Sequence, residues 1–268
     1  MKPEKPLPYI HNAVIDTHCH LDYDYDDKTA DDLIKEAHSE NVSHLMAICT
    51  DLKGITAVQA ISEKHDHVYH SVGIHPHEAR ILTDNDWDVL KKASFHQKCK
   101  AIGELGIDYY YDHGEKEHQL TCLETQLEFA LERKLPIVVH SREGEEDLKI
   151  RLEKYAKKAT HNPGVIHCFT GTKTFGKACL DLGFYISFSG ILTFKNAQDL
   201  RDAAKEFPIE KILVETDSPY LAPVPYRGRK CHPRYVKSTL KVLAETKGID
   251  IEFAALTTTK NAKTLFGF

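Results

Sequence analysis

The chain has 268 residues, of which 41% are hydrophobic and 28% are charged, and its formal net charge is −5. These values are ordinary for a globular protein, and the length is about that of one (β/α)8 barrel. The acidic balance lacks the basic footprint of a high-affinity duplex-DNA binder, and no stretch reaches the roughly 18 apolar residues of a membrane span.

Cysteine usage and the N-terminal residues bear on location and domain organisation. Seven cysteines are scattered singly, without a Cys-x-x-Cys pair, which favours reduced thiols. The first residues are rich in Lys, Pro and Glu and lack the apolar stretch of a signal peptide. We expect a cytoplasmic protein with no membrane attachment and no obligate protein partner. We expect residues 1–12 to form a loose tail and residues 13–268 to form a single barrel domain.

Along the chain, short apolar runs alternate with amphipathic segments. Eight runs are predicted as buried parallel strands, at 13–16, 44–49, 68–73, 100–104, 136–140, 164–167, 184–187 and 212–215. Amphipathic helices are predicted at 29–40, 52–64, 117–134, 233–247 and 251–263. The alternation predicts parallel βαβ units that close into a (β/α)8 barrel of the α/β class. A doubly wound open sheet is the alternative.

Histidine and carboxylate residues recur where the predicted strands end. His18 and His20 follow the first strand, and alternate residues of an extended chain point to the same side. Four later strands end with, or are followed by, Glu104, His140, His167 and Asp217. Barrel enzymes carry their catalytic groups at the C-terminal strand ends, so these six side chains are expected to converge. Their nitrogen and oxygen donors suit divalent ions such as Zn or Mn.

The six residues predict a two-metal hydrolytic site that binds Zn, Mg or Mn. The expected ligands are His18, His20, Glu104 and Asp217 for one ion and Glu104, His140 and His167 for the other. Glu104 would bridge the two ions, and water acidified by metal would be the nucleophile. Asp217 would accept the proton of that water, which makes Asp217 and Glu104 the expected catalytic residues.

Each residue alone also has a structural explanation. The two histidines of His-x-His can be unrelated, and Asp217 before Ser-Pro can be a helix cap. Glu104 can be a solvated loop carboxylate, and His140 and His167 can be hydrogen-bonded interior histidines. Six such residues at matching strand ends favour the metal site over these separate explanations.

Four motifs carry a resemblance to a known family. They are Asp-Thr-His-Cys-His-Leu-Asp at 16–22, Gly-Ile-His-Pro-His at 73–77, Ile-Gly-Glu-Leu-Gly-Ile-Asp-Tyr at 102–109 and Glu-Thr-Asp-Ser-Pro-Tyr-Leu-Ala-Pro at 215–223. From about residue 13 onward, the chain resembles the TatD family of metal-dependent deoxyribonucleases, within the amidohydrolase-like barrels. The resemblance implies a (β/α)8 barrel that hydrolyses DNA phosphodiesters, often as a 3′-to-5′ exonuclease on single strands. Single-stranded DNA is thus the expected partner, and the family's metal ligands fall on the same six residues.

Two positions distinguish this chain within the wider superfamily. Relatives there often bridge two metals with a carbamylated lysine from the fourth strand, where this chain has Glu104. Family members often carry Arg-Gly-x-x-Asn-x-Pro after the last motif, and here Cys231 stands where Asn is usual. Cysteine is a poor hydrogen-bond donor, so either a loop contact or a substrate contact is expected to differ.

Further residues near the strand ends are expected to contact substrate. His75 and His77 follow the third strand and would bind a phosphate oxygen or a flanking nucleotide, although exposed loop histidines would give the same pattern. Arg142 is expected either to reach the mouth of the site or to form a surface ion pair. Glu215, two residues before Asp217, is expected to orient a metal-bound histidine or His75.

Aromatic and basic residues near the predicted rim have two interpretations each. The aromatic residues provide faces for base stacking or simply pack, and they are Tyr109, Tyr110, Tyr111, Tyr220 and Tyr226. The basic run Arg227, Arg229 and Lys230 either faces substrate or is solvated. Cys19 and Cys168 alternate away from the neighbouring ligands and are expected in the core.

Two other functions compete with nuclease activity. One is hydrolysis of an amide or ester bond, as in other barrels of the amidohydrolase superfamily, which the absence of a bridging lysine disfavours. The other is a catalytically silent metal-binding or scaffold protein, against which the intact ligand set argues.

Overall fold

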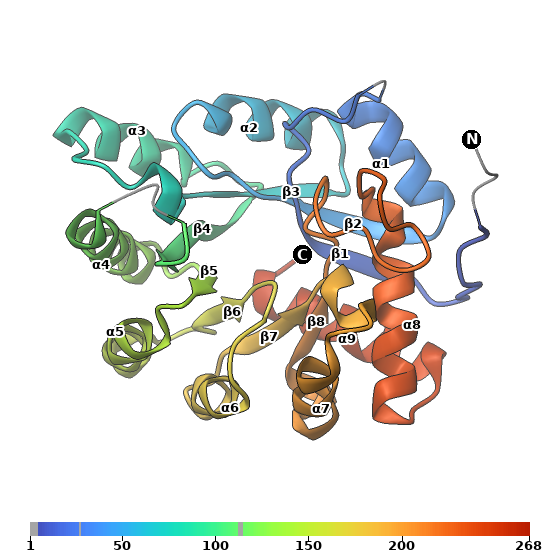
Figure 1. Ribbon diagram of the computed structural model, residues 1–268. Helices are drawn as coiled ribbons and strands as arrows, with labels where there is room; N and C mark the ends of the chain where they lie inside the picture. The colour runs from blue at the N-terminus through green and yellow to red at the C-terminus, as the bar shows by residue number, and fades with distance from the viewer. Residues whose placement is uncertain (1–4, 27, 112–114) are drawn as a thin grey trace.

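The computed structural model describes residues 5–26, 28–111 and 115–268. In these residues eight strands lie side by side in chain order, and all seven neighbouring pairs from β1 to β8 are parallel (Figure 1). The strands are β1 (Val14–Cys19), β2 (Val42–Ala47), β3 (Val68–Val72), β4 (Cys99–Asp108), β5 (Ile137–Arg142), β6 (Gly164–Ile166), β7 (Tyr185–Phe188) and β8 (Ile212–Val214).

Backbone hydrogen bonds join the first strand to the segment after the last one. The amide of Asp217 donates to the carbonyl of His18 at 2.9 Å, and the amide of His20 donates to the carbonyl of Ser218 at 2.8 Å. The Thr17 hydroxyl also donates to the carbonyl of Val214, at 3.0 Å. The sheet is therefore a (β/α)8 barrel, which confirms the predicted fold class over an open doubly wound sheet.

Helices surround the barrel (Figure 1). They are α1 (Ala30–Ser39), α2 (Gly54–Lys64), α3 (Asp84–Ala93), α4 (Lys116–Arg133), α5 (Glu145–Lys158), α6 (Lys173–Asp181), α7 (Gln198–Glu206), α8 (Val236–Lys247) and α9 (Ile251–Phe266). Four short 3₁₀ turns accompany them in the described residues: η1 (Pro76–Glu78), η2 (Gly190–Thr193), η3 (Ile209–Lys211) and η4 (Pro233–Tyr235). In the described part of the chain, no helix is both long and apolar enough to span a bilayer.

Local sequence explains where several helices begin. Thr29 and Thr83 form capping boxes with Asp32 and Asp86, so α1 and α3 begin directly after them. The sequence analysis predicted the helix α1 but did not predict α3, α5, α6 or α7. In α3, the residue that is buried is Leu90. A helix with so small an apolar face gives little periodic signal.

Two layers of apolar side chains position the functional end of the barrel. The larger layer lies between the strands and the surrounding helices. The second includes Ile15, Ala101, Val138, Val165 and Leu213 from the strands, packed against Leu265 and Phe266 of α9. Because α9 and these residues fill one end, polar side chains from the strands gather toward the other, C-terminal end.

Irregular pairing re-aims the polar side chains of β1 and β4. Simple alternation from the interior residue Ile15 would turn His18 away from the barrel axis. The pairing of β1 with β2 shifts between Asp16 and Cys19, and the pairing of β4 with β5 shifts between Ile102 and Leu105. Such irregularities reverse which side chains point inward. Both strands also continue past the apolar runs that predicted them, to Cys19 and Asp108.

The expected N-terminal tail falls partly on residues 1–4, which lie outside the described residues. Further along it, the amides of His11 and Asn12 donate to the Glu252 carboxylate at 2.7 and 2.8 Å. The Tyr226 hydroxyl donates to the carbonyl of Lys5 at 3.0 Å. The described part of this segment therefore contacts α9 and the loop after β8.

His70 of β3 is a fully buried histidine away from the strand ends. The Ser62 hydroxyl donates to the carbonyl of Gln59 at 2.8 Å, so its oxygen accepts from His70 Nδ1–H, also at 2.8 Å. His70 Nε2 is buried and has no hydrogen-bond partner within the described part of the chain. Burial, with smaller contributions from His96 and Lys98, lowers the pKa of His70 to about 3.

We expect His70 to make the protein acid-sensitive. Its pKa is near 6.5 in the unfolded chain, so the unfolded state binds an extra proton between about pH 6.5 and 3. The contribution of neutral His70 to the free energy of unfolding is complete above pH 6.5. Below that pH, each unit by which the pH is lowered reduces it by up to about 1.4 kcal/mol. His70→Asn keeps a donor near Ser62 and should flatten this slope in urea unfolding at pH 5, 6 and 7. An unchanged slope would contradict the assignment.

Candidate metal centre

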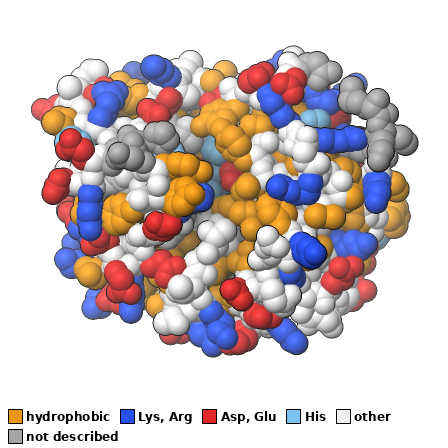
Figure 2. Space-filling view, viewed as in Figure 1, with side chains coloured by type: hydrophobic (Ala, Val, Ile, Leu, Met, Phe, Trp, Pro, Cys, Tyr) orange, Lys and Arg blue, Asp and Glu red, His pale blue; other side chains and the backbone are white. Residues whose placement is uncertain are grey.

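The C-terminal strand ends surround a cavity of about 440 Å³. Figure 2 shows it as a hollow in which histidine and carboxylate surface is visible between hydrophobic areas. Of the six predicted ligands, five line the cavity: His20, Glu104, His140, His167 and Asp217. His18 is fully buried, and its Nε2 lies 3.3 Å from the Glu104 carboxylate. The structure therefore brings all six side chains together.

Glu104 lies at the centre of this cluster, with each carboxylate oxygen facing a different set of imidazoles. Its Oε2 lies 3.3 Å from His18 Nε2 and 4.0 Å from His20 Nε2. Its Oε1 lies 2.7 Å from His167 Nε2 and 2.9 Å from His140 Nδ1. These four imidazoles come from three other strand ends, and a carboxylate shared in this way has the geometry expected of a bridging group.

Asp217 completes the side of the cluster formed by β1. Its Oδ1 lies 3.4 Å from His20 Nε2 and 3.6 Å from His18 Nε2. Its backbone adopts φ of +57°, which is uncommon for a residue other than glycine, and its amide is fixed by the carbonyl of His18. The backbone bond to β1 supports the conformation that brings this carboxylate beside both histidines.

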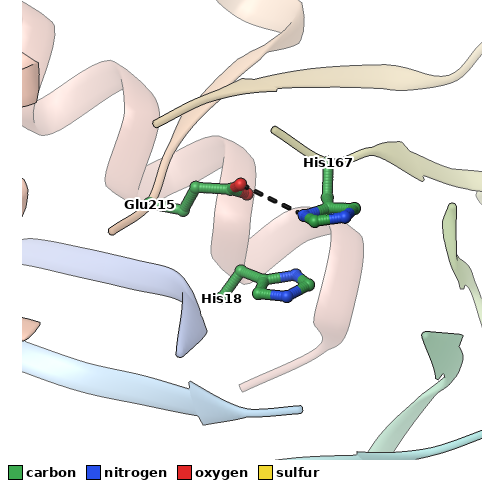
Figure 3. Close-up of side chains that lie close together, drawn as sticks. All are labelled: His18, His167 and Glu215. Carbon is green, nitrogen blue, oxygen red and sulfur yellow. Dashed lines mark hydrogen bonds and ion pairs between the residues drawn. The ribbon is translucent and has the colours of Figure 1, made fainter. Parts of the chain in front are cut away.

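Hydrogen bonds on the far side of two imidazoles determine which nitrogen faces the cluster. A carbonyl oxygen only accepts, so His20 Nδ1 carries a proton toward the carbonyl of Ile48 at 3.3 Å. The Glu215 carboxylate accepts from His167 Nδ1 at 3.3 Å (Figure 3). It also accepts from the amide of Cys168 at 2.7 Å. In both histidines the Nε2 lone pair is then available to a cation.

Asp108 binds the outer nitrogen of His140 as Glu215 binds that of His167, and the sequence analysis did not predict this role. Its Oδ2 lies 3.1 Å from His140 Nε2 and 2.8 Å from His77 Nε2. With a proton on Nε2, His140 directs the Nδ1 lone pair toward Glu104. The sequence feature that could have identified Asp108 is its position four residues after Glu104, at the end of the same strand.

His75 differs from the other histidines of the cluster. The amide of His77 donates to His75 Nδ1 at 3.1 Å, so a neutral His75 carries its proton on Nε2. That Nε2 lies 3.3 Å from Glu104 Oε1, and burial lowers the pKa of His75 to about 4. His75 is therefore a neutral hydrogen-bond donor at neutral pH, directed into the cavity.

Two glutamines of α4 fix the loops that carry these residues. The side-chain oxygen of Gln126 accepts from the amide of Ile74 at 2.8 Å, and its nitrogen donates to the carbonyl of Ile74 at 3.1 Å. Gln119 makes the same pair of bonds with the backbone of Asp108, each at 2.9 Å. Both glutamines are buried, so the backbone beside His75 and at Asp108 is held from outside the barrel.

Opposite charges share this buried space. Burial opposes ionisation of Glu104 and Asp217, yet their histidine neighbours hold the pKa of both carboxyls below its usual value. Burial likewise opposes protonation of His20, His140 and His167, and the carboxylates outweigh it and raise the pKa of all three. A cation bound here would replace protons that the imidazoles otherwise carry.

The donor set suits a divalent cation. Three groups of residues each bring one ligand atom per residue within 4.8 Å of one another: His18, His20 and Asp217; His75, Glu104 and His140; and His18, His167 and Glu215. Figure 3 shows the third group, in which the Glu215 carboxylate faces one nitrogen of the His167 ring. Mixed imidazole and carboxylate donors at several strand ends fit Zn, Mn and similar ions.

The predicted substrate residues occupy different places around the cavity. His75, His77 and Arg142 all line it. The guanidinium carbon of Arg142 lies 4.1 Å from the centre of the Tyr110 ring and 5.0 Å from that of Tyr111, so the exposed Arg142 packs on aromatic faces. No ion pair of Arg142 is found among the described residues.

The structure corrects the expectation for Cys168 and favours one of the two alternatives for Cys231. Cys168 is not in the core as expected: it lines the cavity, with its Sγ 3.1 Å from Ser189 Oγ. β6 ends at Ile166 and the backbone at Cys168 has φ of +40°, so strand alternation no longer applies. Cys231 is fully buried beside Tyr226 and Tyr235, which favours a loop contact over a substrate contact.

Sequence and fold comparisons agree with the geometry. The family model described as TatD related DNase matches residues 15–267. The chain belongs to this family. The resemblance carried by the four motifs is thereby confirmed over nearly the whole chain.

Relatives extend the similarity along the full chain. YcfH of Escherichia coli K12, named an uncharacterized metal-dependent hydrolase, is 40% identical over 94% of this chain and 95% of its own length. The 3'-5' ssDNA/RNA exonuclease TatD of Escherichia fergusonii is 31% identical over 90% of this chain and 94% of its own length. The crystal structure of YjjV, a TatD homologue from Escherichia coli K12, is 27% identical and has a TM-score of 0.88 over 95% of this chain and 98% of YjjV.

Beneath the cluster, Asp16 ties β1 to the segment that carries Asp217. Its Oδ1 accepts from the amides of Thr216 at 2.9 Å and His18 at 3.3 Å, and its Oδ2 accepts from the Thr216 hydroxyl at 2.5 Å. The carboxyl is fully buried, and burial raises the pKa of Asp16 to about 8.

Asp16→Ala should destabilise the fold by about 3 kcal/mol, because buried donors of Thr216 and His18 lose their acceptor. Asp16→Asn keeps an acceptor oxygen of the same shape and should cost about 1 kcal/mol. Chemical unfolding of both variants beside the wild type measures the difference. Equal losses in the two variants would show that the hydrogen bonds of Asp16 are not what stabilises this junction.

Proposed function

We propose that this protein is a metal-dependent nuclease that hydrolyses DNA phosphodiesters, with single strands as substrate and two divalent ions per chain. The observation that carries the proposal is Glu104, whose two oxygens face two separate sets of ligand-type side chains. A single carboxylate between two such sets is what a pair of neighbouring cations needs as a bridge. The names of the relatives support both metal dependence and a nucleic-acid substrate.

The residues divide naturally between two ions. His18, His20 and Asp217 with Glu104 Oε2 would hold one, and His140 and His167 with Glu104 Oε1 would hold the other. Zn, Mg or Mn bound there would polarise a phosphoryl oxygen and acidify a bound water. His75 is excluded from the ligand set in its neutral form, because its proton is on the nitrogen that faces the cavity.

Asp217 is the proposed proton acceptor. Its side chain is 14% exposed, against 4% for Glu104, so it is the carboxylate of the pair that is open to the cavity. Its lowered pKa keeps it ionised near neutral pH and able to accept a proton from water in the site.

Donors beside the metal-ligand cluster suit a phosphate. His75 Nε2–H can donate to a non-bridging oxygen without adding a charge, and Arg142 brings a positive charge to the rim. His77 is held by Asp108 and lies beside His75, with ring centres 4.4 Å apart, so it extends the same surface. A phosphodiester bound over this surface would have its negative charge stabilised by these donors as well as by the cations.

The first test is hydrolysis of an end-labelled single-stranded oligonucleotide by Glu104→Gln and Asp217→Asn. Glu104→Gln should reduce Mn²⁺ binding below two ions per chain and bring cleavage to background. Asp217→Asn should lower kcat by roughly 10²- to 10⁴-fold, the range for loss of a proton acceptor.

Glu128→Gln, on the exposed face of α4, is the matched control and should cleave like the wild type. Full activity in Glu104→Gln would remove the basis of the proposal. Wild-type protein that hydrolyses acylated amino acids but no oligonucleotide, with Mg, Mn or Zn supplied, would instead establish an amide hydrolase.

Asp108→Asn and Glu215→Gln test the proposed positioning of His140 and His167. Each removes the charge that orients an imidazole without removing a ligand, so metal affinity should fall about 10- to 100-fold. Calorimetric titration with Mn²⁺ measures this, and raising Mn²⁺ should restore most of the activity. Unchanged affinity in both variants would contradict the orienting role.

A further inference from the structure

Two pairs of tyrosines flank the cavity on opposite sides of the barrel. Tyr23 and Tyr220, here the β1/β8 wall, follow the first and last strands. Tyr110 and Tyr111, the β4 wall, follow β4. In a ring of eight strands ordered β1 to β8, β4 lies across the barrel from β8 and β1. Tyr23, Tyr111 and Tyr220 line the cavity itself.

The β1/β8 wall is built directly on a metal-ligand candidate. The Tyr23 ring stacks on His20 with 4.7 Å between centres and 17° between planes, and its hydroxyl is 2.9 Å from Thr50 Oγ1. Tyr220 stands edge-on to both rings, 6.2 Å from Tyr23 and 6.3 Å from His20. Tyr220 is nonetheless 54% exposed, so much of its surface remains available to a ligand.

The β4 wall combines exposed aromatic rings with a cation. Tyr110 is 54% exposed and Tyr111 is 43% exposed. Their rings meet edge to face at 4.8 Å, and the Arg142 guanidinium lies over both. Tyr111 also stands 5.5 Å from the His77 ring, so this wall adjoins the proposed phosphate donors.

The surfaces beside the two walls carry different charge. Beside the β4 wall, over the ends of β5, β6 and β7, the cavity continues into a groove that shares Ser141, Arg142, Thr170 and Ile191 with it. Six acidic and three basic side chains line that groove, the acidic ones being Glu143, Glu145, Glu146, Asp147, Asp199 and Asp202. The loop after β8 that carries Tyr220 also carries the basic run Arg227, Arg229 and Lys230, of which Lys230 pairs with Asp24 and Asp26.

On the basis of the proposed nuclease function, we infer that the walls stack the two bases that flank the scissile phosphate. The terminal nucleotide lies on the β4 wall, and the body of the strand leaves across Tyr220. The acidic groove beside the β4 wall repels phosphates and so opposes extension of the strand along it, whereas Arg142 compensates for one terminal unit. Aromatic faces accept any base, so the walls bind without reading sequence.

The test uses linear oligothymidylate in which one nucleotide lacks its base. End labels on the wild-type reaction identify the terminus that is removed first. An abasic unit is then placed at that terminus or one position inward. Stacking by one base corresponds to roughly a 5- to 150-fold change in KM, so each abasic substrate should show a rise of that order with wild-type protein.

Two variants assign each base to a wall. Tyr110→Leu should raise KM for the normal substrate and abolish the extra penalty of the terminal abasic unit alone. Tyr220→Leu should abolish the penalty of the inward abasic unit alone. Tyr110→Phe and Tyr220→Phe keep the ring and should retain the abasic penalties of the wild type. Phe253→Leu, a 50% exposed aromatic residue on α9, is the matched control and should change nothing.

The outcomes separate the inference from the function on which it rests. Cleavage by the wild type with no abasic penalty, or with the penalties exchanged between the two variants, would overturn the inference and leave the nuclease proposal intact. A circular single strand cut as fast as the linear one would also overturn it, since a circle has no terminal unit. Failure of the wild type to cleave any oligonucleotide with Mg, Mn or Zn would remove both.

Discussion

The arrangement of the site depends on one buried carboxylate that several imidazoles share. Glu104 is 3% exposed, and burying such a charge is costly unless it is paired. His18, His140 and His167 supply that pairing from three other strand ends, so β1, β5 and β6 must end at matching heights around β4. The closed barrel meets this requirement because its parallel strands all end at the same rim.

Around this centre, the protein orients its histidines with carboxylates placed behind them. Glu215 binds His167 Nδ1 and Asp108 binds His140 Nε2, while the carbonyl of Ile48 has the same role for His20. His75 is oriented in the opposite sense, with its proton directed into the cavity by the amide of His77. Four chemically identical side chains thus become three lone-pair donors and one proton donor through their outer hydrogen bonds alone.

Sequence alone predicted much of this arrangement, and the failures have physical causes. Apolar runs predicted the strands because barrel strands are buried on both faces, and the ligand-type residues stood out against those runs. The register shifts in β1 and β4 were not visible, since they arise from pairing with neighbouring strands. Asp108 and the exposure of Cys168 were missed for the same reason: each depends on the contacts of a backbone segment beyond its apolar run. The helix α3 buries too little apolar surface to be detected.

The two glutamines of α4 have a consequence for how the site can change. Gln119 and Gln126 are seven residues apart, so they lie about 10 Å apart along α4. Gln126 binds the backbone next to His75, and Gln119 binds that of Asp108. Insertion or deletion of one residue between them would rotate one amide by about 100° away from its loop. The outward residues of α4 are free to vary in chemistry, whereas the length of this helix segment is not free to vary. The relative position of these two rim segments therefore depends on the length of a helix that does not line the cavity.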